Sequence, residues 1–258
     1  MHNDPKLLEK DAHSLLSQGN HEEAYRLFIR AAQAYLERRN HKEAALCFAS
    51  AASSWAMKQD EKAFLNSASA YEEAARQAEL AMDLEYASLM YRYAAIAYER
   101  DMEFSNFSEC FYHSKESQRR FLTNCLFRPG SNAHIGRSGA QKGLGFRLGQ
   151  IIPWLGLNFS SLVWGHGEKP LRTLYCGLGL IIFSTLFYTQ CHLFSGGEVF
   201  RPNFFQAFYF SVITFTTVGY GDMTPVGLSK AMVMIELFWG MFIMPLFIVS
   251  LSRKYLRI

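Results

Sequence analysis

Residues 216–222 read Thr-Thr-Val-Gly-Tyr-Gly-Asp, and this heptapeptide holds the clearest chemistry in the chain. Glycine adopts positive φ angles that other residues resist, so Gly219 and Gly221 allow successive carbonyl oxygens to point to one side. A row of inward-pointing carbonyls can replace the water shell of a cation. The Thr217 hydroxyl would add oxygens at the inner end, with Thr216 and Asp222 as supports.

One chain supplies only part of an oxygen cage around a cation. A closed ring therefore requires several copies around one axis, and we expect four. Between the glycines, the Val218 and Tyr220 side chains should point away from that axis and pack against the preceding helix. The expected cation ligands are the backbone carbonyls of five residues and the Thr217 hydroxyl: Thr217, Val218, Gly219, Tyr220 and Gly221.

Two long apolar segments flank the heptapeptide. Residues 173–197 carry no charge, and residues 231–251 carry only Glu236, so each is long enough to cross a hydrocarbon core of about 30 Å. Lys169 and Arg172 precede the first segment, and Arg253 and Lys254 follow the second. The excess of cationic residues on the cytoplasmic side of membrane proteins then predicts that both termini are cytoplasmic.

The apolar, aromatic segment 203–216 is too short to span a bilayer. The two flanking apolar segments, each crossing the membrane once, already bring both termini to the cytoplasmic side. We therefore expect segment 203–216 to form a helix that enters the membrane and turns back. Non-helical backbone at membrane depth occurs only where protein buries it or where it lines a water-filled path. The order is thus a first spanning helix (171–194), the short helix (203–216), the heptapeptide filter (217–221) and a second spanning helix (229–252).

The intact TTVGYGD sequence resembles the selectivity filter of potassium channels, and residues 171–258 resemble the pore domain of two-transmembrane prokaryotic potassium channels. The resemblance implies a homotetramer that conducts K⁺ in preference to Na⁺, with no other cofactor. It also implies a multi-pass protein of the plasma membrane (the bacterial inner membrane). Some family members carry a glutamate where this chain has Ile213, so Asp222 needs another partner; Tyr209 and Trp239 are the candidates.

Three residues of the second spanning segment are candidates for further roles. Gly240 lies near the family's hinge glycine, and Pro245 removes a backbone hydrogen bond, so a bend at one of them is the expected gate. Either residue could also serve ordinary packing. An acid at membrane depth is costly, so Glu236 is a candidate functional acid. The Glu236 side chain could face the water-filled inner cavity of the pore and attract cations there. It could instead form hydrogen bonds within the protein against the short helix (203–216), and we favour this second role.

Residues 1–125 have a different character, with 19 acidic and 15 basic residues. GNHEEAYRLF at residues 19–28 recurs as RNHKEAALCF at residues 39–48, and weaker copies begin near residues 58 and 82. Each copy has a polar turn, a charged first helical turn and an apolar stripe. The pattern predicts six helices in three antiparallel hairpins. His21 and His41 occupy matching turn positions, which favours a turn role over metal binding.

This half resembles tetratricopeptide repeats, and more closely the helical-hairpin repeats of soluble NSF-attachment proteins. The expected fold is therefore all-α, with a cytosolic repeat array (1–125) and a two-helix pore domain (171–258). Such arrays often bind a protein or ligand on a concave face; a spacer role is the alternative. A basic, Gly- and Ser-rich linker (126–150) should follow. Residues 151–170 are apolar but broken by Pro and Gly, which favours a segment lying at the membrane interface over a third spanning helix.

Other classes of function find little support in the sequence. The five cysteines are scattered with no CxxC pair, which argues against a metal site or disulfide framework. No phosphate loop, nucleophile elbow or triad spacing occurs, so an enzyme is not expected, and neither is a nucleic-acid partner. The expected function is a potassium-selective channel gated at the second spanning helix and regulated by the repeat array. The alternative is a membrane-tethered scaffold whose pore serves assembly.

Overall fold

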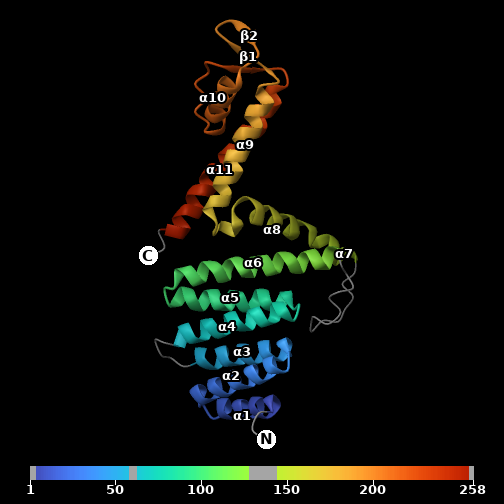
Figure 1. Ribbon diagram of the computed structural model, residues 1–258, viewed down its shortest axis with the longest axis vertical. Coiled ribbons are helices and arrows are strands. Elements are labelled where there is room, and N and C mark those ends of the chain that lie inside the picture. The colour runs from blue at the N-terminus through green and yellow to red at the C-terminus, as the bar shows by residue number, and fades with distance from the viewer. Residues whose placement is uncertain (1–3, 58–62, 128–143, 256–258) are drawn as a thin grey trace. The chain divides into compact units, whose positions relative to one another are not determined.

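The computed structural model describes residues 4–57, 63–127 and 144–255 of the chain. Its contacts divide the chain into two compact units, Met1–Phe159 and Ser160–Ile258. Helices make up most of both units (Figure 1).

The first unit begins with a stack of helices, each packed against the next one along the chain (Figure 1). The part of the chain described before residue 128 forms six helices, the number expected. They are α1 (Pro5–Ser17), α2 (His21–Glu37), α3 (His41–Ala56), α4 (Ala63–Leu80), α5 (Leu84–Arg100) and α6 (Phe104–Phe127).

Equivalent turns join several of these helices. The residue before each cap has a positive φ: 80° at Gly19, 55° at Arg39, 60° at Met82 and 59° at Met102. The next side chain then caps the helix, because the Asn20, Asn40 and Asp83 oxygens accept from the backbone N–H three residues on. Similar sequence at residues 19–28 and 39–48 therefore encodes one turn and one cap, used twice.

Alanines let these helices approach closely, and aromatic rings fill the spaces between them. Fully buried alanines occur on α2 to α5, among them Ala31, Ala44, Ala74 and Ala94. Buried tyrosines keep their hydroxyls satisfied: Tyr98 Oη donates to Glu72 at 2.9 Å, and Tyr35 Oη donates to Glu9 at 3.3 Å.

Two further helices follow α6. The helix α7 (Leu144–Gly149) is short, and α8 (Ile151–Val163) contains the boundary between the units. Of the expected linker 126–150, residues 128–143 lie outside the described residues. Its two ends differ from the expectation, because residues 126–127 complete α6 and residues 144–149 are helical.

The second unit places two long helices around a short one (Figure 1). Its elements are a 3₁₀ turn η1 (Gly165–Gly167), α9 (Pro170–Tyr188), β1 (His192–Ser195), β2 (Glu198–Phe200), α10 (Phe204–Phe215), β3 (Thr224–Val226) and α11 (Ser229–Tyr255). The strands form an antiparallel sheet in the order β2-β1-β3, in which Leu193 lies opposite both Phe200 and Pro225.

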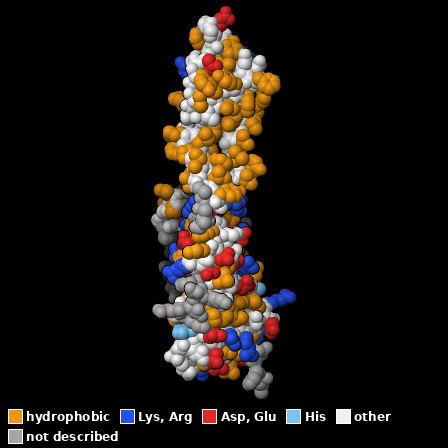
Figure 2. Space-filling model, turned by 90° about the vertical axis from the view of Figure 1, so that its left-hand side faces the viewer, with side chains coloured by type: hydrophobic (Ala, Val, Ile, Leu, Met, Phe, Trp, Pro, Cys, Tyr) orange, Lys and Arg blue, Asp and Glu red, His pale blue; other side chains and the backbone are white. Residues whose placement is uncertain are grey.

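Two helices, α9 and α11, are long and apolar enough to cross a membrane. On the face seen in Figure 2, hydrophobic side chains cover most of the second unit, whereas charged side chains gather on the first. The helix α9 ends at Tyr188, earlier than the expected residue 194. Gly196 and Gly197, at φ 60° and 91°, turn the rest of that apolar segment into the β1–β2 hairpin.

Candidate functional site

The helix α10 directs the heptapeptide, and its start is fixed by a capping box. The Asn203 side chain accepts from the Gln206 N–H, and the Gln206 side chain accepts from the Asn203 N–H. The helix then runs for 12 residues to Phe215, with Thr216 as its C-cap, which agrees with the segment 203–216 identified from the sequence.

The end of α10 sets the conformation of Thr217 and Val218 in the heptapeptide. The Thr217 N–H donates to the Thr214 carbonyl, and the Val218 N–H donates to the Ile213 carbonyl, each at 3.0 Å. This is a Schellman end, in which the residue at the position of Thr217 is usually glycine. Thr217 instead holds φ at 59°, a left-handed conformation that is strained for a β-branched residue.

The two glycines of the heptapeptide also have positive φ, 52° at Gly219 and 79° at Gly221. A Cβ added at either glycine would meet nothing within 4 Å in a single chain, so the backbone conformation alone explains the need for glycine. Residues 217–222 are all exposed. Val218 and Tyr220, expected to pack against the short helix, are 53% and 72% exposed, because α10 of the same chain does not cover them.

Asp222 has a partner at the outer end of the heptapeptide. The Tyr209 hydroxyl donates to Asp222 Oδ2 at 3.0 Å, so one of the two candidate partners meets it. This bond joins the first half of α10 to the residue directly after the filter segment.

The outer sheet holds the chain that leaves the heptapeptide. The strand β3 begins two residues after Asp222 and pairs with β1, the strand that follows α9. Ser229, at the start of α11, accepts from the Val226 N–H and donates to the His192 carbonyl. The chain segment before α10 and the segment after the heptapeptide are therefore bonded to each other.

Glu236 lies at the meeting point of α9, α10 and α11 and is fully buried. The Tyr188 hydroxyl of α9 lies 2.7 Å from Oε2, and the Ser211 hydroxyl of α10 lies 2.5 Å from Oε1. Of the two roles considered from the sequence, this geometry agrees with a bond inside the protein against the short helix. Sequence reasoning did not identify Tyr188 or Ser211, since neither carries a spacing signal of its own.

Gly240 lies one helical turn beyond Glu236 and packs against the end of α10. A Cβ added at Gly240 would lie 2.3 Å from the Phe215 carbonyl oxygen. The Phe215 ring in turn lies 3.3 Å from the position a Cβ would take at Gly177 of α9. Gly240 thus permits a close helix approach, while α11 continues as one helix through both Gly240 and Pro245.

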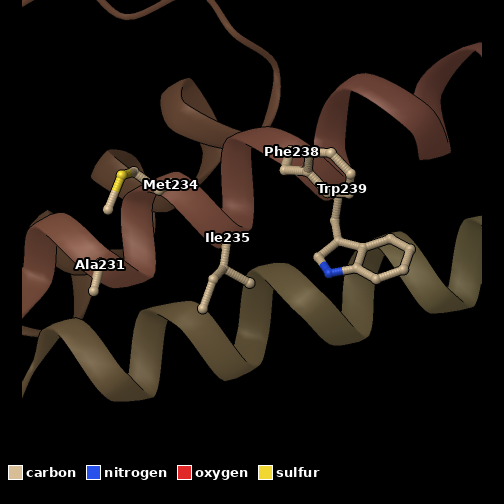
Figure 3. Close-up of a pocket in the computed structure, with 5 residues that line it drawn as sticks. All are labelled: Ala231, Met234, Ile235, Phe238 and Trp239. Atoms are coloured by element: carbon tan, nitrogen blue, oxygen red, sulfur yellow. The ribbon is translucent and has the colours of Figure 1, made fainter.

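An open apolar groove of about 440 Å³ follows the first half of α11. It is lined by Ala231, Met234, Ile235, Phe238 and Trp239, which lie along successive turns of that helix (Figure 3). The lining is almost entirely apolar, and the indole N–H of Trp239 is its polar side-chain group.

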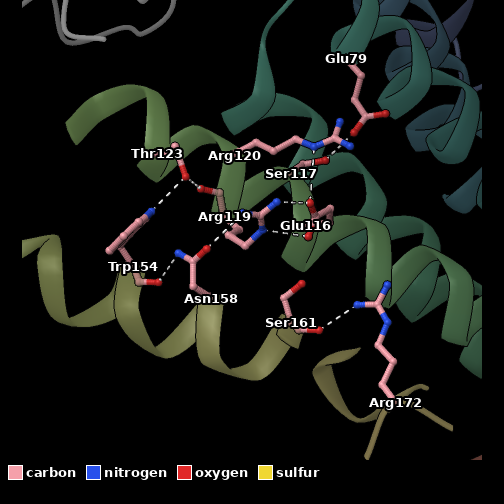
Figure 4. Close-up of polar contacts among 10 residues, drawn as sticks. All are labelled: Glu79, Glu116, Ser117, Arg119, Arg120, Thr123, Trp154, Asn158, Ser161 and Arg172. Carbon is pink, nitrogen blue, oxygen red and sulfur yellow. Dashed lines mark hydrogen bonds and ion pairs between the residues drawn. The ribbon is translucent and has the colours of Figure 1, made fainter. Parts of the chain in front are cut away.

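In the first unit, α8 is bound to α6 through one of its faces (Figure 4). Trp154 Nε1 donates to Thr123 Oγ1 at 3.0 Å, and Arg119 donates to Asn158 Oδ1 at 3.1 Å. The Phe127 ring packs edge-on against Trp154. The opposite side of α8 exposes an apolar stripe: Ile152, Leu155, Phe159 and Leu162.

The chain between α8 and α9 makes a tight left-handed turn. Gly165, His166 and Gly167 all have positive φ, and Arg172 donates to the Ser161 carbonyl at 2.8 Å (Figure 4). A Cβ added at Gly167 would lie 2.7 Å from an Arg253 guanidinium nitrogen. The last turn of α11 therefore packs on this turn, at the end of the unit away from the outer sheet.

Comparison with known proteins identifies a related family. Residues 175–257 match the Ion_trans_2 family, described as "Ion channel". One vertebrate relative is the potassium voltage-gated channel subfamily KQT member 1 of Xenopus laevis, which is 31% identical over 37% of this chain and 16% of its own length. Another is the potassium channel subfamily T member 1 of Gallus gallus, which is 38% identical over 28% of this chain and 6% of its own length.

An archaeal relative is the hyperpolarization-activated voltage-gated potassium channel of Methanocaldococcus jannaschii, 40% identical over 27% of this chain and 36% of its own. The chain thus spans well under half the length of these relatives. No solved structure matches it. The relatives are channels rather than enzymes, and with α9 and α11 they indicate a membrane protein.

Proposed function

We propose that the chain is one subunit of a homotetrameric, potassium-selective channel that conducts K⁺ passively through residues 217–221. The observation that carries the proposal is the intact TTVGYGD heptapeptide at the end of the short helix α10, with Gly219 and Gly221 at positive φ. The similarity of residues 175–257 to ion channels and the names of the relatives support it.

The chemistry of conduction is the exchange of water oxygens for protein oxygens. Carbonyls of residues 217–221 and the Thr217 hydroxyl would contact a K⁺ ion that has shed its water shell. Several successive binding positions let one ion displace the next, so the ions bind and still leave. Thr216 and Asp222 would hold the two ends of this segment, Asp222 with the help of Tyr209.

The exposure of residues 217–222 supports the requirement for several copies. A single chain leaves this segment open to solvent, where a cation would keep its water. Four copies around an axis would close the ring and cover Val218 and Tyr220, which α10 of the same chain leaves exposed.

In the membrane, α9 and α11 would span the bilayer with α10 re-entrant between them, and both termini would be cytoplasmic, in a bacterial inner membrane. Residues 151–170 would lie at the interface. The exposed apolar stripe of α8 supports this placement, because such a face is stable only against lipid or protein. The gate would be a bend of α11 near Gly240 or Pro245.

Regulation would come from the helical array of residues 1–125, through a protein or ligand on its concave face. The bonds of Trp154 and Asn158 with α6 offer a route that does not depend on the linker. A movement of α6 would reach α8, which continues into the second unit.

Ion flux from liposomes tests the proposal. The purified full-length protein is compared with a chain beginning at Gly149 and with the full-length variant Gly219→Ala, and K⁺ and Na⁺ efflux are both measured. We expect K⁺-selective flux from the wild type and loss of selectivity in Gly219→Ala. Stronger flux from the shortened chain would identify the array as inhibitory. No flux from assembled wild-type tetramers would favour the scaffold instead.

A further inference from the structure

We propose that Glu236 is a positioning residue for the filter: as a neutral acid it bonds Ser211 and fixes the last turn of α10 against α9 and α11. The inference rests on the proposed function, because it assigns ion selectivity in part to a carboxyl group that touches no ion. It deepens that function by naming what holds the filter-bearing helix in register.

Counting the hydrogens of the two hydroxyl groups bonded to Glu236 favours the neutral form of the carboxyl group. Tyr188 supplies one hydrogen, to Glu236 Oε2. Ser211 has one hydrogen but lies within bonding distance of two acceptors, Glu236 Oε1 and, at 3.1 Å, the Ile181 carbonyl. If Glu236 carries the proton on Oε1, it donates to Ser211, and Ser211 donates to Ile181. Each of the three contacts then has its own hydrogen.

The surroundings favour the same form. Glu236 is fully buried, and within the described ranges its contacts are hydroxyl groups, with no ion pair to a cationic side chain. An ionised carboxylate buried without a counter-charge is strongly disfavoured, whereas a neutral acid needs only its hydrogen bonds. The group therefore acts as a donor and acceptor between helices rather than as a charge.

Two contacts between α10 and α11 anchor α10: Ser211 bonds Glu236, and Phe215 packs against Gly240. The two residues on each helix are four positions apart and therefore lie on one face of that helix. The anchored turn includes Ile213, whose carbonyl accepts from the N–H groups of Val218 and Gly219. A displacement of this turn would therefore displace the first filter carbonyls.

Removing the carboxyl group should loosen the turn without removing any ion ligand. In Glu236→Ala, Ser211 and Tyr188 lose their shared partner, and the cavity admits movement of α10. Glu236→Gln keeps the arrangement, since its amide oxygen accepts from Tyr188 and its NH₂ group donates to Ser211. If Glu236 instead acted as a negative charge on the wall of the water-filled pore, Glu236→Gln would lower the K⁺ to Na⁺ flux ratio as much as Glu236→Ala, because both substitutions remove the charge.

The experiment is the ratio of K⁺ to Na⁺ flux in liposomes for full-length wild type, Glu236→Gln, Glu236→Ala, Ser211→Ala and Tyr188→Phe. Thr185→Val is the matched control: it removes a buried hydroxyl of α9 that bonds the Ile181 carbonyl but not Glu236. We expect wild-type ratios for Glu236→Gln and Thr185→Val and a ratio at least tenfold lower for Glu236→Ala. The double variant Glu236→Ala/Ser211→Ala should fall no further than either single one.

Each result has a separate meaning. A wild-type ratio in assembled Glu236→Ala, or an equal loss in Glu236→Gln and Glu236→Ala, would overturn the inference while leaving the channel intact. If Glu236→Ala fails to assemble, Ser211→Ala and Tyr188→Phe decide it, and unchanged ratios in both would overturn it. Absence of selective flux from the wild type would overturn the proposed function, and this inference with it.

Discussion

Tyr209 and Asp222 are bonded across the outer end of the heptapeptide, with the phenol hydroxyl 3.0 Å from the carboxylate. The bond connects α10, the helix that precedes the heptapeptide, with the last residue of the heptapeptide. Ile213 cannot accept or donate a hydrogen bond through its side chain, so it is not a partner of Asp222.

Loss of this bond should destabilise the open filter. In Tyr209→Phe the ring stays and only the hydroxyl is removed, so we expect K⁺ flux to start normally and then decline several-fold faster than in the wild type. Time-resolved flux measures the decline. Tyr175→Phe, on an exposed position of α9, serves as the control; an unchanged decline in Tyr209→Phe would show that Asp222 is held by other groups.

Gly240 should not tolerate a methyl group. In Gly240→Ala the new Cβ would lie 2.3 Å from the Phe215 carbonyl, so α10 and α11 must separate. Overpacking of this kind typically costs about 1–3 kcal/mol. We expect lower thermal stability of the detergent-purified protein and a reduced K⁺ to Na⁺ flux ratio.

Gly179→Ala is the matched control for that variant. Gly179 also lies inside a helix, α9, but a Cβ there would meet nothing within 4 Å. Alanine stabilises a helix interior by about 1 kcal/mol relative to glycine, so stability should be equal or higher. Equal behaviour of the two variants would mean that the close approach of Gly240 to Phe215 does not exist in the assembled protein.

Cys47 should resist thiol reagents in the native state. Burial, with Glu9 and Glu43 nearby, raises the pKa of its thiol from 9.0 to about 12. The reactive thiolate predominates only above that pKa, so at pH 8 it amounts to about one part in ten thousand of the thiol. Maleimide labelling followed by mass spectrometry should modify Cys47 only after unfolding.

The half-buried cysteines provide the internal comparison. Cys125 and Cys191, which lie outside the two proposed spanning helices, are more accessible than Cys47. Native labelling of Cys47 at their rate, between pH 7 and 9, would contradict the packing of α3 against its neighbours.

The contact between α6 and α8 should matter for regulation. The double variant Trp154→Phe/Asn158→Leu removes the two hydrogen bonds to α6 and the bond from the Asn158 amide to the Trp154 carbonyl, and it keeps an aromatic ring beside Phe127. Each lost bond is worth about 1 kcal/mol. We expect faster hydrogen exchange in residues 151–159. If the array acts through this contact, flux from the double variant should approach that of the chain beginning at Gly149.

A matched variant with substitutions on the opposite side of α8, Leu155→Ile/Leu162→Ile, keeps the bonds to α6 and the apolar stripe. Its hydrogen exchange and flux should equal those of the wild type. Unchanged exchange in Trp154→Phe/Asn158→Leu would show that the α6 contact does not hold α8.

Local signals account for the parts of the fold that could be predicted. Asn20, Asn40 and Asp83 cap their helices within a few residues, so helix starts can be read from the sequence. The charge-free segments likewise identify α9 and α11. The structure ends α9 earlier than the charge-free segment predicts, because β1 also lacks charged residues and its strand conformation depends on pairing with β3, some 30 residues later.

Contacts between distant segments account for what could not be predicted. Nothing near Glu236 in the sequence indicates that its partners are Tyr188 and Ser211, 48 and 25 residues away. The bonds between α6 and α8 join segments 31 and 39 residues apart, and residues 128–143 between them carry no periodic pattern. The close contact of Gly240 with Phe215 could not be predicted either, because a single sequence does not distinguish a glycine that permits close packing from one that bends a helix.

The pairing of β1 with β3 has a mechanical consequence. It closes the chain from the end of α9 to the start of α11 into a hydrogen-bonded loop that contains α10 and the heptapeptide. A force that tilts α9 or α11 would act first on the hydrogen bonds between β1 and β3, and less on the backbone of residues 217–221. The sheet would thereby let the two long helices move while the carbonyl oxygens of the proposed filter keep their spacing.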